Sequence, residues 1–443
     1  MYVTLRYSVK SYIKGIRQGA LPGEEFEELG RDTEEGLEAA KILEEAGYDA
    51  FNADAGTYDS FYWPHPANYH EKGMYLHLTE QLKKVVHVPV LVAGRMDDPD
   101  IALDALERDR ADGIGLGRPL LADPDYVNKL RSGRLRDIRP CLSCHDGCAT
   151  RNMSGVRASC AVNPEAAREL ITGIVPAAEK KNVFVIGGGL GGMEAARVSA
   201  LRGHKVTLFE AGDALGGNVI AGSVPSFKED DKALIKWYVN QLEKLNINVK
   251  MNTHATREMI LNEKPDVVFT ATGSKKIIPR LPGIDRENVT DASAVLLGEK
   301  TVGDHCVVIG GGLVGCELAL YLAQQNKKVT IVEALQDILK AGAPLAIMNE
   351  MMLRDLLNQH HVNIKSSARL IQVNETGAVV ACGEASETIP AESIIIAVGF
   401  KKEDKIYNEL RYDVDEIYNI GDSRAVRNIR GAIWDAYEVA RSI

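Results

Sequence analysis

The stretch Val183–Gly192, which reads VFVIGGGLGG, decides the fold of the C-terminal part of this chain. Its apolar residues predict a short buried strand, and Gly187, Gly189 and Gly192 then place a Gly-x-Gly-x-x-Gly pattern at the start of a predicted helix. A second apolar run follows this helix and ends at Glu210. In this order the glycines permit a tight turn, close approach of a pyrophosphate and close helix–strand packing, while the acid binds a ribose hydroxyl. The stretch therefore predicts a dinucleotide-binding α/β fold.

The same pattern occurs a second time. Gly310, Gly312 and Gly315 follow the apolar run Cys306–Ile309, and the next apolar run ends at Glu333. Two such units in one chain predict two bound dinucleotides, one flavin and one nicotinamide. Because the carboxylate of Glu333 would repel a 2′-phosphate and no arginine follows it directly, NADH is expected rather than NADPH.

Two later glycines indicate how the units are arranged. Gly273 closes the segment after the first unit, and Gly421 precedes Asp422 near the C-terminus. Asp422 is placed to bind a ribityl hydroxyl of a flavin, although aspartate is also common in turns and at helix N-caps. The order predicts an NAD(H)-binding domain of residues 301–394, inserted into an FAD-binding domain of residues 176–300 plus 395–443.

Four cysteines precede these units within the segment 136–175. Cys141, Cys144, Cys148 and Cys160 have the spacing C-x2-C-x3-C-x11-C. Four thiolates from one loop can bind a [4Fe–4S] cluster or a tetrahedral zinc ion, and the spacing alone leaves both open. The redox domains predicted beside the loop favour the cluster, because an electron relay has a use there and structural zinc has none.

Residues 1–135 alternate between predicted strands and helices. The strands are expected at Val3–Tyr7, Asp49–Asp54, Pro89–Arg95 and Gly113–Arg118, and a helix at Thr33–Ala46. Glycines and charged residues at the strand ends are typical of a βα-barrel, which binds its ligands at that face. Four strands are countable and a closed barrel has eight, so the segment is predicted to be the C-terminal half of a (β/α)8 barrel.

Composition narrows the class of protein. A chain of 443 residues suggests about three domains, and a net charge of −10 argues against nucleic acid or an anionic membrane as a partner. No apolar run reaches the roughly eighteen residues of a membrane span, and the start does not resemble a signal peptide. Seven cysteines, four of them clustered, form no disulfide framework, which favours a reducing cytoplasm.

Residues 176–443 resemble flavoproteins of the pyridine-nucleotide–disulfide-reductase type, but they lack a redox-active Cys-x-x-Cys or Cys-x4-Cys pair. Together with the cysteine loop, the chain resembles the NADH:flavin oxidoreductase family of 2,4-dienoyl-CoA reductase, trimethylamine dehydrogenase and clostridial 2-enoate reductase. Bile-acid enone and bilirubin reductases are relatives within this family. The resemblance covers essentially the whole chain, and the cysteine loop matches the cluster spacing of the family.

The resemblance implies that the N-terminal segment binds FMN. Gly94, Arg95, Gly117 and Arg118 match the positions that hold the flavin phosphate late in the barrel. Arg6 matches an arginine that approaches the electron-rich edge of the isoalloxazine. Without the resemblance, surface charges are the alternative interpretation of arginines at strand ends.

The resemblance also suggests catalytic residues. Tyr58 falls where the dienoyl-CoA reductases place a histidine near the substrate, and His65 lies in the same aromatic segment. Either side chain could orient or protonate a substrate, or the aromatic segment could serve only for packing. The first four strands of the family's barrel and its main proton donor have no counterpart here. The expectation is a truncated chain, or a barrel completed by a separate polypeptide or within a homo-oligomer.

For a protein with the complete barrel, the resemblance also implies a function. Electrons would pass from NADH to FAD, through a [4Fe–4S] cluster to FMN, and reduce an activated C=C bond of an unsaturated acid or enone. A cluster of this kind favours an anaerobe. The alternatives are an NADH diaphorase or electron-transfer subunit, because the barrel is expected to be incomplete, and a remnant that only folds and binds.

Overall fold

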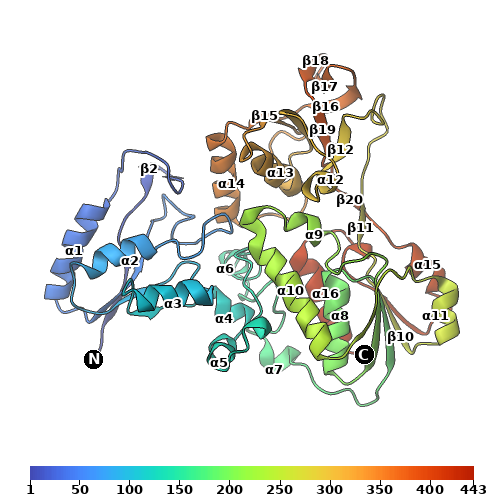
Figure 1. Cartoon of the computed structure of the whole chain (residues 1–443), viewed down its shortest axis with the longest axis horizontal. Helices are drawn as coiled ribbons and strands as arrows, with labels where there is room; N and C mark the ends of the chain where they lie inside the picture. Colours follow the sequence, from blue (N-terminus) through green and yellow to red (C-terminus); the bar gives the residue numbers. More distant parts are fainter. The chain divides into compact units, whose positions relative to one another are not determined.

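The computed structural model describes all residues from Met1 to Ile443 and consists of two compact units. The first unit contains Met1–His145 and Ala346–Asp355, and the second contains Asp146–Leu345 and Leu356–Ile443. Strands and helices alternate along the chain (Figure 1), which confirms the predicted α/β class.

The first unit is built on a four-stranded parallel sheet with the order β1-β4-β5-β6. The strands are β1 (Thr4–Ser8), β4 (Ala50–Asp54), β5 (Val90–Val92) and β6 (Gly113–Ile114). The helices between them are α1 (Thr33–Glu45), α2 (Leu76–Lys83) and α3 (Pro99–Glu107). The strands thus lie side by side in chain order, as successive strands of a βα-barrel do.

Side-chain alternation gives this sheet one apolar face. Tyr7, Phe51 and Val92 are buried, whereas Arg6 and its register partner Asn52 are more exposed. Because successive residues of a strand point to opposite faces, the polar side chains collect on one side of the sheet.

Shorter elements complete the first unit: β2 (Ile13–Gly15), β3 (Gln18–Gly19), α4 (Arg118–Ala122), α5 (Tyr126–Arg131) and η1 (Leu135–Asp137). Part of α14 (Ile347–Gln359) also groups with this unit. The amide nitrogen of Asn349 donates to Asn68 Oδ1 at 2.5 Å, and the hydroxyl of Tyr62 donates to Asp355 at 3.0 Å. These bonds fix the helix segment within the first unit.

The second unit contains two parallel five-stranded sheets. The first has the order β21-β10-β7-β8-β9. Its strands are β7 (Asn182–Ile186), β8 (Lys205–Phe209), β9 (Asn248–Lys250), β10 (Val267–Thr270) and β21 (Glu416–Asn419). Beside it lie α8 (Leu190–Leu201), α10 (Glu229–Lys244) and α16 (Ile429–Ala440), and α8 packs on both other helices (Figure 1). The C-terminal strand β21 thus lies in the sheet of the first glycine motif.

The second sheet has the order β12-β19-β13-β14-β15. Its strands are β12 (Val289–Asp291), β13 (His305–Ile309), β14 (Lys328–Val332), β15 (Asn363–Lys365) and β19 (Ser393–Ile396), with the helices α12 (Ala292–Leu296) and α13 (Leu313–Ala323). Because β12 pairs with β19, the fold around the second motif begins before residue 301.

An antiparallel pair, β11 (Ser274–Lys276) and β20 (Phe400–Lys402), joins the regions of the two sheets. A three-stranded antiparallel sheet packs against the second: β16 (Arg369–Val373), β17 (Gly377–Cys382) and β18 (Ala385–Pro390). The remaining elements are α6 (Ala149–Met153), α7 (Glu169–Thr172), α9 (Val219–Gly222), η2 (Ser226–Lys228), α11 (Arg257–Glu263), α15 (Lys405–Leu410) and η3 (Gly421–Ser423).

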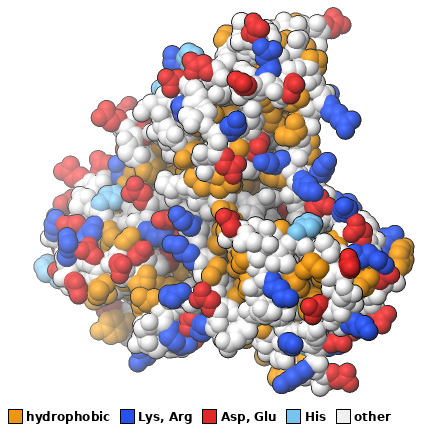
Figure 2. All heavy atoms as spheres, turned by 45° about the vertical axis from the view of Figure 1, so that its right-hand side comes forward, with side chains coloured by type: hydrophobic (Ala, Val, Ile, Leu, Met, Phe, Trp, Pro, Cys, Tyr) orange, Lys and Arg blue, Asp and Glu red, His pale blue; other side chains and the backbone are white.

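The surface carries charges of both signs. On the face that Figure 2 shows, acidic and basic side chains are interspersed. Every helix is too short or too polar to cross a membrane.

Candidate functional site

The first glycine motif forms the turn between β7 and α8. Gly187 has a φ of +109°, and a Cβ there would overlap the carbonyl of Ala271. A Cβ at Gly192 would overlap the carbonyl oxygen of Gly187, so the helix packs directly on the turn. Gly189 differs, because nothing lies within 4 Å of the position of its Cβ. The motif therefore has two glycines that the backbone requires and one that faces open space.

Glu210 closes the loop beside this motif. Its carboxylate accepts hydrogen bonds from the backbone nitrogens of Gly188 and Gly212, each at 2.7 Å. The side chain is therefore held at the end of β8 next to the glycine turn, where a ribose would bind.

A cavity of about 800 Å³ opens in front of the first motif. Six of the seven residues predicted for the flavin site line it: Gly187, Gly189, Glu210, Gly273, Gly421 and Asp422. The seventh, Gly192, lies behind the turn. Asp422 accepts a hydrogen bond from the backbone nitrogen of Arg427 at 3.0 Å and lies 3.3 Å from Ser274 Oγ. The volume is typical of a cofactor site, and the open position at Gly189 fits a pyrophosphate.

The second motif repeats this geometry between β13 and α13. Gly310 has a φ of +110°, and a Cβ at Gly315 would overlap the carbonyl oxygen of Gly310. Nothing lies within 4 Å of the Cβ position of Gly312. The carboxylate of Glu333 accepts hydrogen bonds from the backbone nitrogens of Gly311 at 2.6 Å and Leu335 at 2.7 Å. These residues fit a second dinucleotide, with an acid at its ribose.

A buried group of charges in the wall of the cavity escaped the sequence analysis. Lys228 Nζ lies 3.0 Å from Glu317 Oε1 on α13 and 3.4 Å from Asp231 Oδ2 on α10. Burial raises the pKa of Asp231. Burial opposes the charged form of Lys228, yet Glu317 and Asp231 raise its pKa. In the sequence this lysine stands in an ordinary charged helix start, and nothing there indicates its partner on the other fold.

In the first unit, Arg6 lies on the exposed side of the sheet. Its guanidinium forms an ion pair with Asp54 and donates to the carbonyl of Pro64 at 3.3 Å. Burial raises the pKa of Asp54, and the charge of Arg6 opposes this shift. The side chain of Arg6 is 63% exposed, so it remains accessible for a ligand.

The residues predicted for the flavin phosphate differ in their surroundings. Arg95 is 5% exposed, and its Nη1 donates to the carbonyls of Asn68 and His70, both at 2.7 Å. Arg118 begins α4, and its Nη1 lies 2.8 Å from His145 Nε2. A Cβ at Gly94 would overlap the ring of Tyr75, whereas Gly117 faces open space. The open position at Gly117 beside Arg118 fits a phosphate, while Arg95 holds the chain around Asn68.

The catalytic candidates lie on the loop after β4. Tyr58 is 83% exposed, and its ring centroid is 6.1 Å from that of Phe61. The ring of His65 is 4.5 Å from that of Phe61, and its Nδ1 is 3.2 Å from the carbonyl oxygen of Phe61. Burial lowers the pKa of His65. The three rings thus form a row, with a freely accessible phenol at one end.

The four clustered cysteines divide between the units. Cys141 and Cys144 belong to the first unit, and Cys148 and Cys160 to the second. None of the seven cysteines is in a disulfide. Neither unit contains a group of three or more His, Cys, Asp or Glu side chains placed to hold a metal ion. Four cysteine thiolates can bind either an iron–sulfur cluster or a zinc ion.

Two glycine motifs, each followed by an acid, with a cavity lined by the first motif and by Val314 and Glu317 of α13, are typical of flavin- and nicotinamide-dependent oxidoreductases. Residues 154–269 and 181–435 match the pyridine nucleotide-disulphide oxidoreductase family, and residues 22–137 match the NADH:flavin oxidoreductase / NADH oxidase family. The chain therefore belongs to the flavin oxidoreductases that combine these two modules, which confirms the predicted family and the binding of flavin and NAD(H).

The chain is similar to several named proteins over most of its length. The chain is 48% identical over 441 residues to a cinnamate reductase of Clostridium sporogenes, covering 100% of this chain and 66% of the relative. It is 35% identical over 370 residues to a bilirubin reductase of Mediterraneibacter gnavus, covering 82% of this chain and 57% of the relative. A solved 2-naphthoyl-CoA reductase in complex with 2-naphthoyl-CoA has a TM-score of 0.88 at 32% identity, covering 99% of this chain and 64% of that chain. The chain thus spans two thirds or less of the length of these relatives.

Proposed function

We propose that this chain acts as an NADH-dependent ene-reductase of the iron–sulfur flavoprotein type. Its substrate would be a small unsaturated acid or enone with an activated C=C bond. The observation that carries the proposal is the single cavity bordered by both the flavin motif and α13 of the nicotinamide motif. The similarity to a cinnamate reductase supports the substrate class. A cytoplasmic location and a small-molecule partner belong to the same proposal.

The residues of the second unit are assigned to dinucleotide binding. Bound FAD and NADH would supply hydride transfer, and a [4Fe–4S] cluster would supply one-electron transfer. Gly187, Gly189 and Glu210 would hold the pyrophosphate and ribose of FAD, and Asp422 its ribityl chain. The corresponding residues for NADH are Gly310, Gly312, Gly315 and Glu333. The Lys228 ammonium keeps a positive charge in the cavity wall, between two carboxylates.

The remaining cofactor assignments rest on the family. Cys141, Cys144, Cys148 and Cys160 would ligate the cluster. Gly117 and Arg118 would hold the FMN phosphate, with Arg6 at the flavin edge. Arg95, which follows Gly94, would support this site through its bonds to the carbonyls of Asn68 and His70. Tyr58 is the better placed proton donor of the two candidates, because its phenol is accessible and the pKa of His65 is lowered by burial.

A second candidate function is an NADH diaphorase or electron-transfer subunit. The observation that favours it is the location of both dinucleotide motifs within the second unit, where α13 of the second motif borders the cavity of the first. Such a unit suffices to pass electrons from NADH to an artificial acceptor, whatever the first unit binds.

One anaerobic experiment separates these functions. The purified chain is expected to contain FAD and about four irons and four sulfides, in keeping with ligation by four thiolates. NADH oxidation is then measured with a dye and with cinnamate. Turnover with both supports the ene-reductase, and turnover with the dye alone supports the diaphorase. Stoichiometric zinc without visible absorption from iron would exclude the relay.

The nucleotide preference tests Glu333. Wild-type protein is expected to reduce its flavin faster with NADH than with NADPH, because the carboxylate would repel a 2′-phosphate and bond a ribose hydroxyl. Loss of a charge-assisted bond costs about 1.5–3 kcal/mol, so Glu333→Arg should move the ratio toward NADPH by roughly ten- to a hundredfold. The measurement is stopped-flow bleaching of the flavin with each nucleotide.

Glu333→Gln is the matched control for this change. It removes the charge and keeps an acceptor oxygen for one of the two backbone nitrogens that Glu333 binds, those of Gly311 and Leu335. A preference of the wild-type protein for NADPH would show that the acid does not select the nucleotide.

A further inference from the structure

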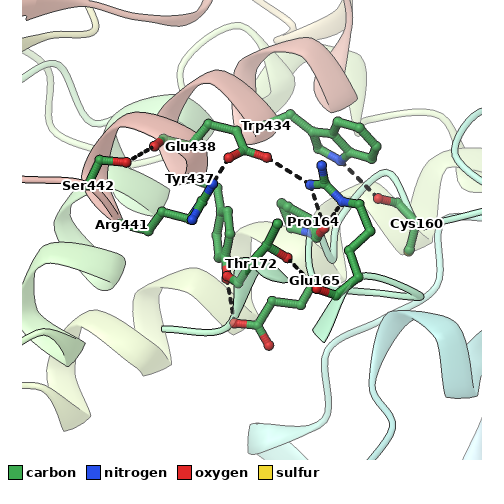
Figure 3. A network of polar contacts seen from close by, with 10 residues as sticks. Cys160, Pro164, Glu165, Thr172, Trp434, Tyr437, Glu438, Arg441 and Ser442 are labelled. Carbon is green, nitrogen blue, oxygen red and sulfur yellow. Dashed lines mark hydrogen bonds and ion pairs between the residues drawn. The ribbon is translucent and has the colours of Figure 1, made fainter. Parts of the chain in front are cut away.

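Helix α16 connects two parts of the second unit that the sequence places far apart. Its N-cap Asn428 and its residues Ile429 and Ala432 line the dinucleotide cavity. The next turn carries Trp434, whose indole points toward Cys160 (Figure 3). The same helix therefore borders the flavin site and contacts the cysteine loop.

Hydrogen bonds attach both ends of the segment Asp146–Cys160 to this helix. Trp434 Nε1 donates to the carbonyl oxygen of Cys160 at 3.0 Å (Figure 3). At the start of the loop, Asn428 Nδ2 donates to Asp146 Oδ2, also at 3.0 Å. Within the loop, a Cβ at Gly147 would overlap the backbone of Cys160 and Ala161, so the two arms are in contact. The segment from Asp146 to Cys160 is thus seated on α16.

Three arginines surround the indole of Trp434. The guanidinium carbons of Arg151, Arg168 and Arg430 lie 5.3, 4.8 and 5.7 Å from the ring centroid. Arg168 pairs with Glu438 at 2.9 Å, and Arg430 pairs with Asp146 at 3.3 Å. Each contact of this kind stabilises the position of the indole.

The three arginines around the indole outnumber the two carboxylates that form ion pairs with them. Arg151 donates from Nε to the carbonyl of Arg157 and forms no ion pair with a carboxylate. Burial, followed by repulsion from Arg430 and Arg168, lowers the pKa of Arg151.

We propose that Trp434 is a positioning residue, which holds the arm of the loop that carries Cys148 and Cys160 on the helix that borders the dinucleotide cavity. This role extends the proposed function. It depends on that function only because Cys148 and Cys160 are assigned there as cluster ligands. Residues that hold the backbone of a ligand fix its orientation and alter the affinity of the site for metal. Trp434 acts through Cys160 and touches no reacting atom.

Hydrogen–deuterium exchange of the full-length, FAD-bound protein tests the placement without any need for iron. Trp434→Phe keeps the aromatic face for the arginines and removes the N–H donor. The amides of residues 156–161 are expected to exchange roughly tenfold faster, as the loss of one hydrogen bond allows. Trp434→Leu also removes the aromatic face, so exchange should rise by a further factor of roughly three to ten.

Trp237→Phe is the matched control, because Trp237 stacks on Arg197 and its variant should leave these amides unchanged. In iron-loaded protein, Trp434→Phe should also change the EPR signal of the reduced cluster and speed the loss of iron, while FAD content stays at the wild-type level. Unchanged exchange in both Trp434 variants would overturn the proposal, and so would a loss of FAD that accompanies the loop change. Wild-type protein without iron would refute the proposed cluster, while the exchange rates would still decide the role of Trp434.

Discussion

Replacing Gly189 by valine is expected to give a folded protein that loses much of its FAD during purification. The backbone at Gly189 has a φ of −70° and a ψ of 178°, a conformation that any residue adopts. Nothing of the protein lies within 4 Å of the Cβ position, so the new side chain costs little in folding. It would occupy the open space in which the pyrophosphate must approach the backbone. Overpacking of this kind costs about 1–3 kcal/mol, which weakens FAD by roughly a hundredfold at its upper end.

The ratio of flavin to protein absorbance after purification measures this loss, and circular dichroism shows whether the fold is retained. Gly192→Ala provides the contrast, because a Cβ there would overlap the carbonyl oxygen of Gly187 and should destabilise the protein itself. Retention of FAD at the wild-type level in Gly189→Val would show that the first motif does not bind the flavin pyrophosphate.

Replacing Gly312 by valine is expected to leave FAD in place and to abolish its reduction by NADH. Gly312 has the same extended conformation, with a φ of −71° and a ψ of −178°, and the same open space around its Cβ position. The side chain would block the nicotinamide dinucleotide in the way that valine at Gly189 blocks the flavin. We expect the rate of flavin reduction at low NADH to fall by roughly a hundredfold.

Dithionite is the control for this variant, since it reduces bound flavin without a nucleotide site. The two valine variants also control each other, because each alters one motif and leaves the other intact. If Gly312→Val lost its FAD while Gly189→Val retained it, the two motifs would have to exchange their assignments.

Sequence patterns that span only a few residues predict the local structure of this chain correctly. The strands of both units and the turns at Gly187 and Gly310 follow from apolar runs and glycine spacing within a few residues. These patterns act on the backbone directly, through side-chain alternation and allowed φ values. The α/β class was therefore predictable.

Contacts between distant segments carried no such signal. The pairing of Lys228 with Glu317 and the bond from Trp434 to Cys160 join residues from different elements, and neither follows from periodicity. Arg95 shows a related difficulty, since a buried arginine bonded to carbonyls has the same sequence context as one that holds a phosphate. The assignments in the first unit therefore depend more on family resemblance than those in the second.

The pairing of β11 with β20 bears on how such a chain can arise in evolution. The chain leaves the flavin-type fold at Ser274–Lys276 and returns at Phe400–Lys402, and these strands lie in register side by side. The second dinucleotide-type fold is thus inserted into the first at a single position, and the two strands that connect them are adjacent. An insertion of this geometry imposes little loop-closure entropy on the host, because the two ends are already close. The nicotinamide module could accordingly be gained, exchanged or lost as a cassette without opening the sheet that receives it.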